Sequence, residues 1–111
     1  MKIKYQHKKL RKTTADLRSI SKNYGTMAKK VIQRLKEMEA SPTLEVLGKI
    51  PAARCHQLVG DFAGHLAVDV SGNHRIIFKP DHDPPPEKED GGLDWSQVTA
   101  ITIVAIGEDY H

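Results

Sequence analysis

Residues 65–79 read HLAVDVSGNHRIIFK, and this stretch decides the fold. Apolar and polar residues alternate on both sides of the short connection 71–73, which contains Gly72. A period of two around a glycine-containing turn is typical of an antiparallel β-hairpin with one buried face. We therefore predict one strand at 65–70 and a return strand at 74–79.

Three further stretches extend this hairpin into a sheet. Residues 54–59 predict a strand that ends at Gly60-Asp61, and residues 1–6 carry a weaker strand signal. Residues 98–106 are apolar on both faces, which is typical of an interior strand that is covered on both sides. The sheet that we expect is therefore curved and mostly antiparallel.

The first forty residues follow a different period. Apolar residues recur at helical spacing from about residue 8 to Tyr24, and again from Met27 to Met38. Thr26 is the expected N-cap of the second helix, which Ser41-Pro42 ends. The predicted fold class is α+β: a single small domain, residues 1–111, in which a basic N-terminal helical hairpin packs on the sheet.

Residues 80–96 interrupt the strand pattern. This stretch contains three consecutive prolines, two glycines and many acidic residues. Such a composition favours a loop over a regular element. We expect an acidic, proline-rich loop at about 80–96, and residues 80–92 of it should be mobile and lie outside the core.

The composition excludes several classes of protein. The 111 residues are 39% hydrophobic, and the longest strongly apolar run, near residues 100–106, is far too short to span a bilayer. The sequence begins MKIKYQHKKLRK, without the apolar run of a secretory signal, and its one cysteine has no partner for a disulfide. We expect a cytoplasmic protein that has no membrane partner.

The charge is distributed very unevenly. Residues 1–40 hold 12 Lys and Arg against 3 Asp and Glu, whereas residues 80–111 hold 1 against 8. A basic face can bind RNA, because Lys and Arg neutralise its phosphates. The residues that we expect to bind RNA are Lys29, Lys30, Arg34 and Arg54. Charge alone leaves two alternatives open: a solvated helix face, or a face that binds an acidic protein.

Chemically capable side chains lie in or beside three predicted strands. Arg54 and His56 stand two positions apart, so in a strand their side chains share a face. Arg75 follows the hairpin turn, and Glu-Asp-Tyr-His at 108–111 follows the apolar strand. RNA cleavage by the neighbouring 2′-OH requires a proton acceptor, a proton donor and a cation for the phosphate. Histidine supplies the first two and arginine the third.

Each of these residues also has a plain structural explanation. A lone histidine is more often structural than catalytic, Arg75 could pair with Asp61 or Asp69, and terminal residues often fray. His56, His65 and His74 recur every nine residues, a spacing that could suggest a zinc site. We interpret that spacing as coincidence and expect neither a metal nor a cofactor.

A set of ordered motifs carries a resemblance. It consists of RCHQLVGD at 54–61, Gly64, VDVSGNHRIIF at 68–78 and Asp109-Tyr110-His111. In order and spacing, these motifs resemble the HigB-type toxins of the RelE/ParE superfamily, and the basic helical hairpin before them agrees. The resemblance covers residues 1–79 and 98–111.

The resemblance implies a bacterial toxin that cleaves mRNA on the ribosome, without a metal, and is silenced by a cognate helix-turn-helix antitoxin of the HigA type. By the same resemblance, His56 and His111 transfer protons, Arg75 holds the phosphate, Tyr110 stacks on or orients the nucleotide, and Asp109 orients a histidine. We expect these residues to converge on one concave, cationic surface.

Two alternatives and several departures from the family pattern remain. A ParE-like inhibitor of gyrase would need no proton-transfer groups, and a catalytically inactive relative would only bind RNA or antitoxin. Val59 stands where many relatives have a lysine, and His74 replaces an aromatic residue. The acidic stretch 80–96 is longer than usual. These departures affect the expected activity more than the expected fold.

Overall fold

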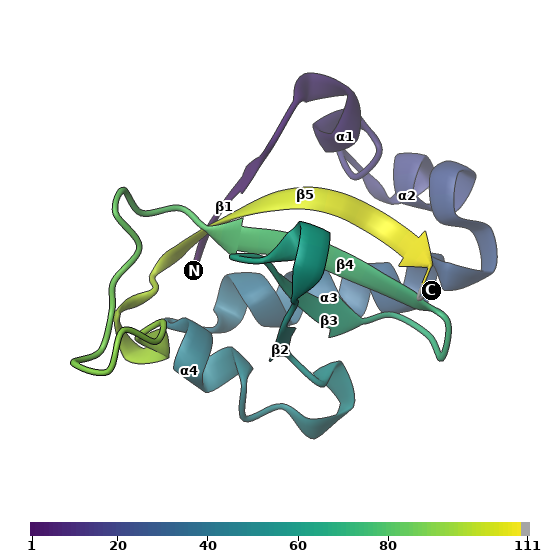
Figure 1. Ribbon diagram of the computed structural model, residues 1–111. Helices are drawn as coiled ribbons and strands as arrows, with labels where there is room; N and C mark the ends of the chain where they lie inside the picture. The colour runs from purple at the N-terminus through teal and green to yellow at the C-terminus, as the bar shows by residue number, and fades with distance from the viewer. Residues whose placement is uncertain (110–111) are drawn as a thin grey trace.

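The computed structural model describes residues 1–109, and the side chains of residues 1–108. In this part of the chain one sheet has the strand order β1-β5-β4-β3-β2 (Figure 1). β1 pairs with β5 in parallel, and the other neighbours are antiparallel. The strands are β1 (Lys2–Tyr5), β2 (His56–Gln57), β3 (Leu66–Asp69), β4 (His74–Pro80) and β5 (Ala100–Asp109).

The helices precede most of the sheet in the chain, which confirms the predicted α+β class. They are α1 (Lys8–Lys12), α2 (Leu17–Tyr24), α3 (Ala28–Ala40) and α4 (Leu44–Leu47). Short 3₁₀ turns lie at η1 (Gly25–Met27), η2 (Pro51–Ala53), η3 (Gly60–Phe62) and η4 (Trp95–Gln97). In Figure 1, α3 runs behind the sheet. Among the described residues, no helix is long and apolar enough to cross a membrane.

The N-terminal helical segment differs in detail from the sequence prediction. The stripe that begins at residue 8 is two helices, because the Asp16 carboxylate accepts a hydrogen bond from Ser19 N at 2.7 Å and starts α2. Gly25, with φ of 54°, ends α2. Thr26 is not an N-cap, since η1 runs directly into α3 without a side-chain cap.

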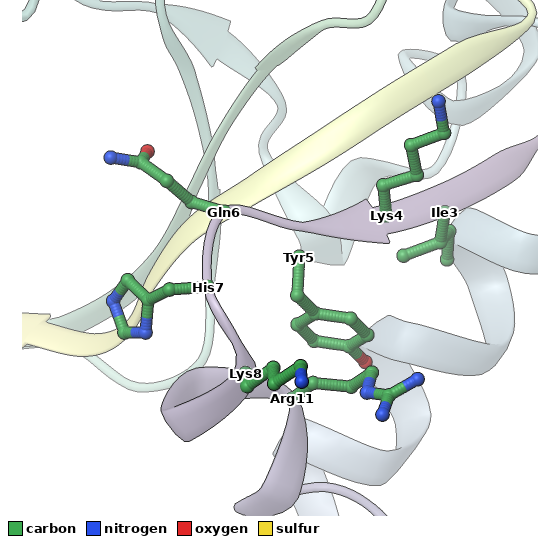
Figure 2. Close-up of a pocket in the computed structure, with 7 residues that line it drawn as sticks. All are labelled: Ile3, Lys4, Tyr5, Gln6, His7, Lys8 and Arg11. Atoms are coloured by element: carbon green, nitrogen blue, oxygen red, sulfur yellow. The ribbon is translucent and has the colours of Figure 1, made fainter.

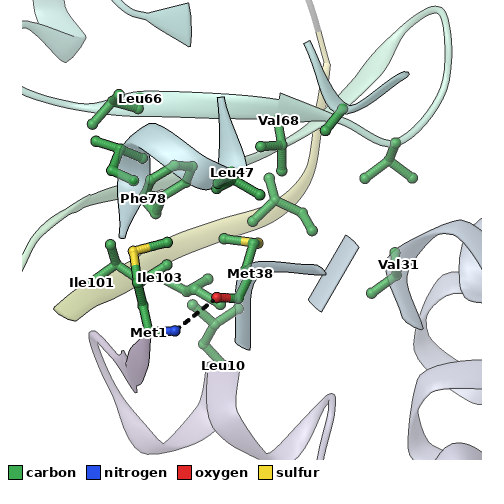
Figure 3. Close-up of a cluster of buried hydrophobic side chains, with 14 of the residues drawn as sticks. Met1, Leu10, Val31, Met38, Leu47, Leu66, Val68, Phe78, Ile101 and Ile103 are labelled. Atoms are coloured by element: carbon green, nitrogen blue, oxygen red, sulfur yellow. Dashed lines mark hydrogen bonds between the residues drawn. The ribbon is translucent and has the colours of Figure 1, made fainter. Parts of the chain in front are cut away.

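The core lies between the sheet and the helices (Figure 3). Val31 and Met38 from α3 belong to one buried cluster with Leu66, Phe78 and other sheet residues. The Met1 ammonium donates hydrogen bonds to the carbonyls of Met38 and Glu39 at 3.1 and 2.8 Å. This contact ties the start of β1 to the end of α3.

The position of β5 confirms the prediction for residues 98–106. β5 lies between β1 and β4, so it is an interior strand. Ile101 and Ile103 are fully buried on the side of the core, whereas Thr102 and Val104 on the other face are only half-buried. The cover over that second face is therefore thinner than the sequence pattern suggests.

Two register shifts between β4 and β5 accompany the curvature of the sheet. They fall between Arg75 and Ile76 and between Ile77 and Phe78. Extra residues of this kind bend a strand and increase its local twist. Figure 1 shows the resulting arc of β5 over β4.

The acidic stretch 80–96 is mostly a loop, with one isolated bridge between Glu87 and Leu93, and its mobility stays a prediction. Pro80 still belongs to β4, and Trp95 begins η4. Between them, Lys88 N donates to Gly92 O at 2.7 Å and Asp94 N donates to Pro86 O at 2.9 Å. These bonds pair part of the loop's backbone with itself.

We expect that Trp95→Ala lowers the free energy of unfolding by about 2 kcal/mol, as a large-to-small change at a half-buried site. Trp95 packs against the core and over Gly48, where an added Cβ would lie 2.9 Å from the indole ring. Chemical denaturation measures the change, and Glu89→Ala at an exposed position is the control. An equal, small effect of both changes would show that Trp95 does not anchor the segment.

Candidate active site

The register of the sheet places His56 and Arg75 on one face. His56 lies opposite Ala67, and Arg75 lies opposite Asp69 on the other side of β3. Directly opposed residues share a face, and so do residues two apart in a strand. Their backbone positions are thus about 7 Å apart along the strands and about 10 Å apart across them. The two residues share a face, and their convergence on one pocket stays a prediction.

Asp69 lies between the two and binds a third residue of the site. Its carboxylate accepts from Arg54 Nε at 2.7 Å and from Arg54 Nη2 at 3.2 Å. This is a two-pronged contact of the kind that arginine favours with carboxylates. Arg54 is 58% exposed in its side chain, and Asp69 is 23% exposed. The contact therefore sits at the rim of the face, open to solvent.

Arg54 itself does not stand in a strand, contrary to the sequence prediction. It follows η2 and has φ of 45°, in the left-handed region. Such a conformation is uncommon for a residue other than glycine and often occurs where the surroundings require it. Arg54 reaches the face of His56 by its pairing with Asp69 rather than by strand alternation.

The backbone of Arg54 determines the tautomer of His56. His56 Nδ1 lies 2.7 Å from the carbonyl oxygen of Arg54. Because a carbonyl only accepts hydrogen bonds, Nδ1 must carry the proton and donate it. In the neutral ring, Nε2 is then the basic nitrogen. This is the form that a general base requires.

Arg75 is held at the other end of the face. In the register it stands between Asp69 on β3 and Glu108 on β5. Its guanidinium carbon lies 5.9 Å from the centre of the Phe62 ring, which η3 presents. An arginine over an aromatic ring is attracted by the ring electrons. Phe62 therefore lies beside the cation that the family resemblance assigns to the phosphate.

Among the side chains that the structure describes, this face carries charges of both signs. Arg54 pairs with Asp69, and Arg75 lies opposite Asp69 and Glu108 in the register. Lys79, four positions along β4 from Arg75, adds a cation to the same face. The cationic surface that we expected stays a prediction.

The C-terminal motif is only partly within the described residues. Asp109 is the last residue of β5, and its backbone pairs with that of His74. Tyr110 and His111 lie outside the described residues. β5 runs beside β4, the strand of Arg75. β2, the strand of His56, lies two strands beyond β4 in the sheet. β5 therefore ends next to Arg75 and not next to His56.

The expected RNA-binding residues of α3 separate into two groups. Lys29 and Lys30 are exposed, as predicted. Arg34 is buried, with 3% exposure, so its assignment to the polar helix face is wrong. The guanidinium donates to Asp69 O at 2.6 Å, to Ala52 O at 2.9 Å and to a Glu37 carboxylate oxygen at 2.8 Å. Arg34 is a structural link between α3, β3 and η2.

The three evenly spaced histidines do not form a cluster. Across residues 1–108, no three His, Cys, Asp or Glu side chains gather as a metal ion would require. His65 instead lies edge-on to Phe62, with ring centres 5.8 Å apart, and His74 Nδ1 bonds the Ser71 hydroxyl at 2.8 Å. Each of these histidines thus has a local role.

Cys55 lies between Arg54 and His56, and we expect it to be unreactive. Burial raises the pKa of its thiol to about 12. At pH 8 the folded chain should hold roughly a thousandfold less thiolate than the unfolded chain, because thiolate content falls tenfold per pH unit below the pKa. Alkylation by iodoacetamide, followed by mass spectrometry, should be slow in buffer and fast in denaturant. Equal rates would contradict the burial of Cys55.

Comparison with known proteins identifies the architecture. No protein-family model and no curated protein matches this sequence. Among solved structures, the YoeB/ParE toxin from Agrobacterium tumefaciens superposes with a TM-score of 0.55 at 12% identity, over 99% of this chain and 100% of the toxin. The chain has the YoeB toxin fold.

Two structures from Staphylococcus aureus agree with this result. The YoeB–YefM complex matches with a TM-score of 0.54 at 15% identity, and the YoeB dimer with 0.52 at 16%. Both alignments cover 99% of this chain and 98% of the other. The YoeB fold confirms the RelE-like architecture that the motifs predicted.

Proposed function

We propose that this chain is the toxin of a type II toxin–antitoxin system, and that it cleaves mRNA on the ribosome. The observation that carries the proposal is the shared sheet face of His56 and Arg75 in a chain with the YoeB fold. The Nδ1–H tautomer of His56 supports a proton-accepting role. An inhibitor that acts only by binding would have no use for such a group.

The chemistry follows from these residues. His56 Nε2 takes the proton of the 2′-OH, whose oxygen attacks the neighbouring phosphorus. The bond from phosphorus to the 5′-oxygen then breaks, and His111 gives that oxygen a proton. Arg75 balances the charge that develops on the phosphate oxygens. The products are a 2′,3′-cyclic phosphate and a 5′-hydroxyl end, and no metal takes part.

The remaining residues have supporting roles in this proposal. Asp109 orients a histidine, and Tyr110 stacks on or orients the nucleotide. Arg54, Lys29 and Lys30 bind RNA through its phosphates. Within the fold, the chain is of the HigB type, and its partner is a helix-turn-helix antitoxin of the HigA type. A neighbouring gene for a small helix-turn-helix protein is the simplest genetic check, and a YefM-like neighbour would place the chain in the YoeB group instead.

The proposal predicts that Arg75→Ala abolishes growth arrest on induction while the protein still binds its antitoxin. The lost cation stabilises the transition state, and a comparable donor is worth about 3–4 kcal/mol in other enzymes. Growth curves and co-purification with the antitoxin measure the two effects. Full toxicity of a folded Arg75→Ala protein would favour a ParE-like action on gyrase.

A further inference from the structure

A hollow of about 510 Å³ lies at the edge of the sheet that is remote from β2, in the bend between β1 and α1 (Figure 2). Residues 3–8 and Arg11 line it. Two strand spacings, about 10 Å, separate β1 from the strand of Arg75, and four, about 19 Å, separate it from the strand of His56. The hollow is thus separate from the candidate active site.

The side chains around the hollow are basic. Lys4, Lys8 and Arg11 line it and are exposed, and no acidic residue is among its described lining residues. The Lys4 ammonium lies 3.3 Å from a carboxylate oxygen of Asp81, outside the lining, so Lys8 and Arg11 are the cations on which the inference rests. His7 Nδ1 accepts a hydrogen bond from Leu10 N at 3.2 Å, so in the neutral ring the proton lies on Nε2. His7 therefore presents a donor as well. Lys8, Arg11 and His7, with no carboxylate among the described lining residues, favour an anion.

An aromatic ring lies among these donors. Tyr5 extends from β1 toward α1, and Lys8 and Arg11 lie beside its ring (Figure 2). The Tyr5 hydroxyl accepts a hydrogen bond from the Thr14 hydroxyl at 2.9 Å, which holds the ring in place. An aromatic platform flanked by cations is how many proteins bind single-stranded nucleic acid, with a base on the ring and phosphates on the cations.

We propose that this hollow binds one nucleotide of single-stranded RNA. The base stacks on Tyr5, and Lys8 and Arg11 bind the flanking phosphates. The inference rests on the proposed function only in taking RNA as the ligand. It adds a second anchor for the strand, at a distance from the scissile bond, on the edge of the sheet opposite to β2.

Helix α1 provides a matched pair of variants for the test. Lys8 and Arg11 line the hollow, whereas Lys9 and Lys12 are exposed on the same helix and do not line it. Lys8→Gln with Arg11→Gln therefore changes the net charge as much as Lys9→Gln with Lys12→Gln. Any difference in RNA affinity between the two double variants therefore arises from the hollow and not from the overall electrostatic field of the protein.

The probe is a fluorescent RNA hexanucleotide with 2′-O-methyl groups, which binds without being cleaved. Fluorescence anisotropy with the full chain should show about tenfold weaker binding for the Lys8/Arg11 pair, in line with lost hydrogen bonds to charged phosphates. The slope of log Kd against log salt should fall by about 0.7 for each lost phosphate contact. The Lys9/Lys12 pair should bind nearly as the natural chain does.

The aromatic contact has its own pair of variants. Tyr5→Phe keeps the ring and should bind the hexanucleotide as before, whereas Tyr5→Leu should weaken binding at least about fivefold. If Tyr5→Leu fails to fold, amide shifts of the natural chain on adding the hexanucleotide replace it. We expect those shifts to centre on residues 3–11.

Several results would overturn the inference. These are no binding of the hexanucleotide, equal losses for the two α1 pairs, or an acidic peptide that binds the hollow while RNA does not. Failure of the proposed function would give a different result. Binding of the hexanucleotide would still depend on Lys8 and Arg11, but the mRNA would stay intact. Arg75→Ala should keep hexanucleotide binding at the hollow, which separates the two sites.

Discussion

His56→Ala is expected to slow mRNA cleavage by roughly 10²- to 10⁴-fold, the range for loss of a general acid or base. The physical reason is the contact of Nδ1 with the carbonyl oxygen of Arg54 at 2.7 Å, which leaves Nε2 as the basic nitrogen of the neutral ring. Primer extension on mRNA from a translation extract, as a function of time, measures the rate.

His82→Gln is the matched control for this prediction. His82 Nε2 accepts a hydrogen bond from Thr99 N at 3.1 Å, beyond the end of β4, and the Gln side chain can accept the same bond. We expect this variant to cleave at the natural rate. Cleavage at the natural rate by a folded His56→Ala protein would remove His56 from the mechanism.

Arg34→Ala is expected to lower the free energy of unfolding by about 3 kcal/mol, because it removes one partner of a buried, hydrogen-bonded charge pair. The change would remove the Arg34 donor from the carbonyls of Ala52 and Asp69 and from one carboxylate oxygen of Glu37. For a domain of this size, about 3 kcal/mol corresponds to a fall in Tm of more than about 10 °C. Urea denaturation measures the free energy.

Lys30→Ala is the control on the same helix, because Lys30 is exposed. A surface substitution of this kind usually changes stability by less than about 0.5 kcal/mol. We expect the two variants to differ clearly. If Arg34→Ala unfolds at the same urea concentration as Lys30→Ala, then Arg34 does not link α3 to the sheet.

The sheet could be predicted from the sequence because its signals are local. The hairpin of β3 and β4 alternates with a period of two, and the interior position of β5 follows from its apolar character on both faces. The burial of Arg34 could not be predicted in this way. It lies at helical spacing from Val31 and Met38, both fully buried, but a charged residue is usually exposed. Only the distant carbonyls that it binds explain its burial.

The candidate site could be predicted only in part, because its arrangement also depends on contacts between residues that are distant in the sequence. Strand alternation shows the face of His56 and of Arg75 only relative to their own neighbours. That the two share a face depends on the register of β3, which lies between them. The pairing of Arg54 with Asp69 joins residues 15 positions apart, and the left-handed backbone at Arg54 has no signature in the sequence. Phe62 and the hollow at Tyr5 were missed because both depend on how loops fold back.

The most direct test of the toxin proposal is to add the purified chain to a translation extract and map the ends of the mRNA. The account predicts cleavage within translated reading frames, with 2′,3′-cyclic phosphate and 5′-hydroxyl ends, and loss of that cleavage with His56→Ala. Intact mRNA in the presence of the folded natural chain would contradict the account.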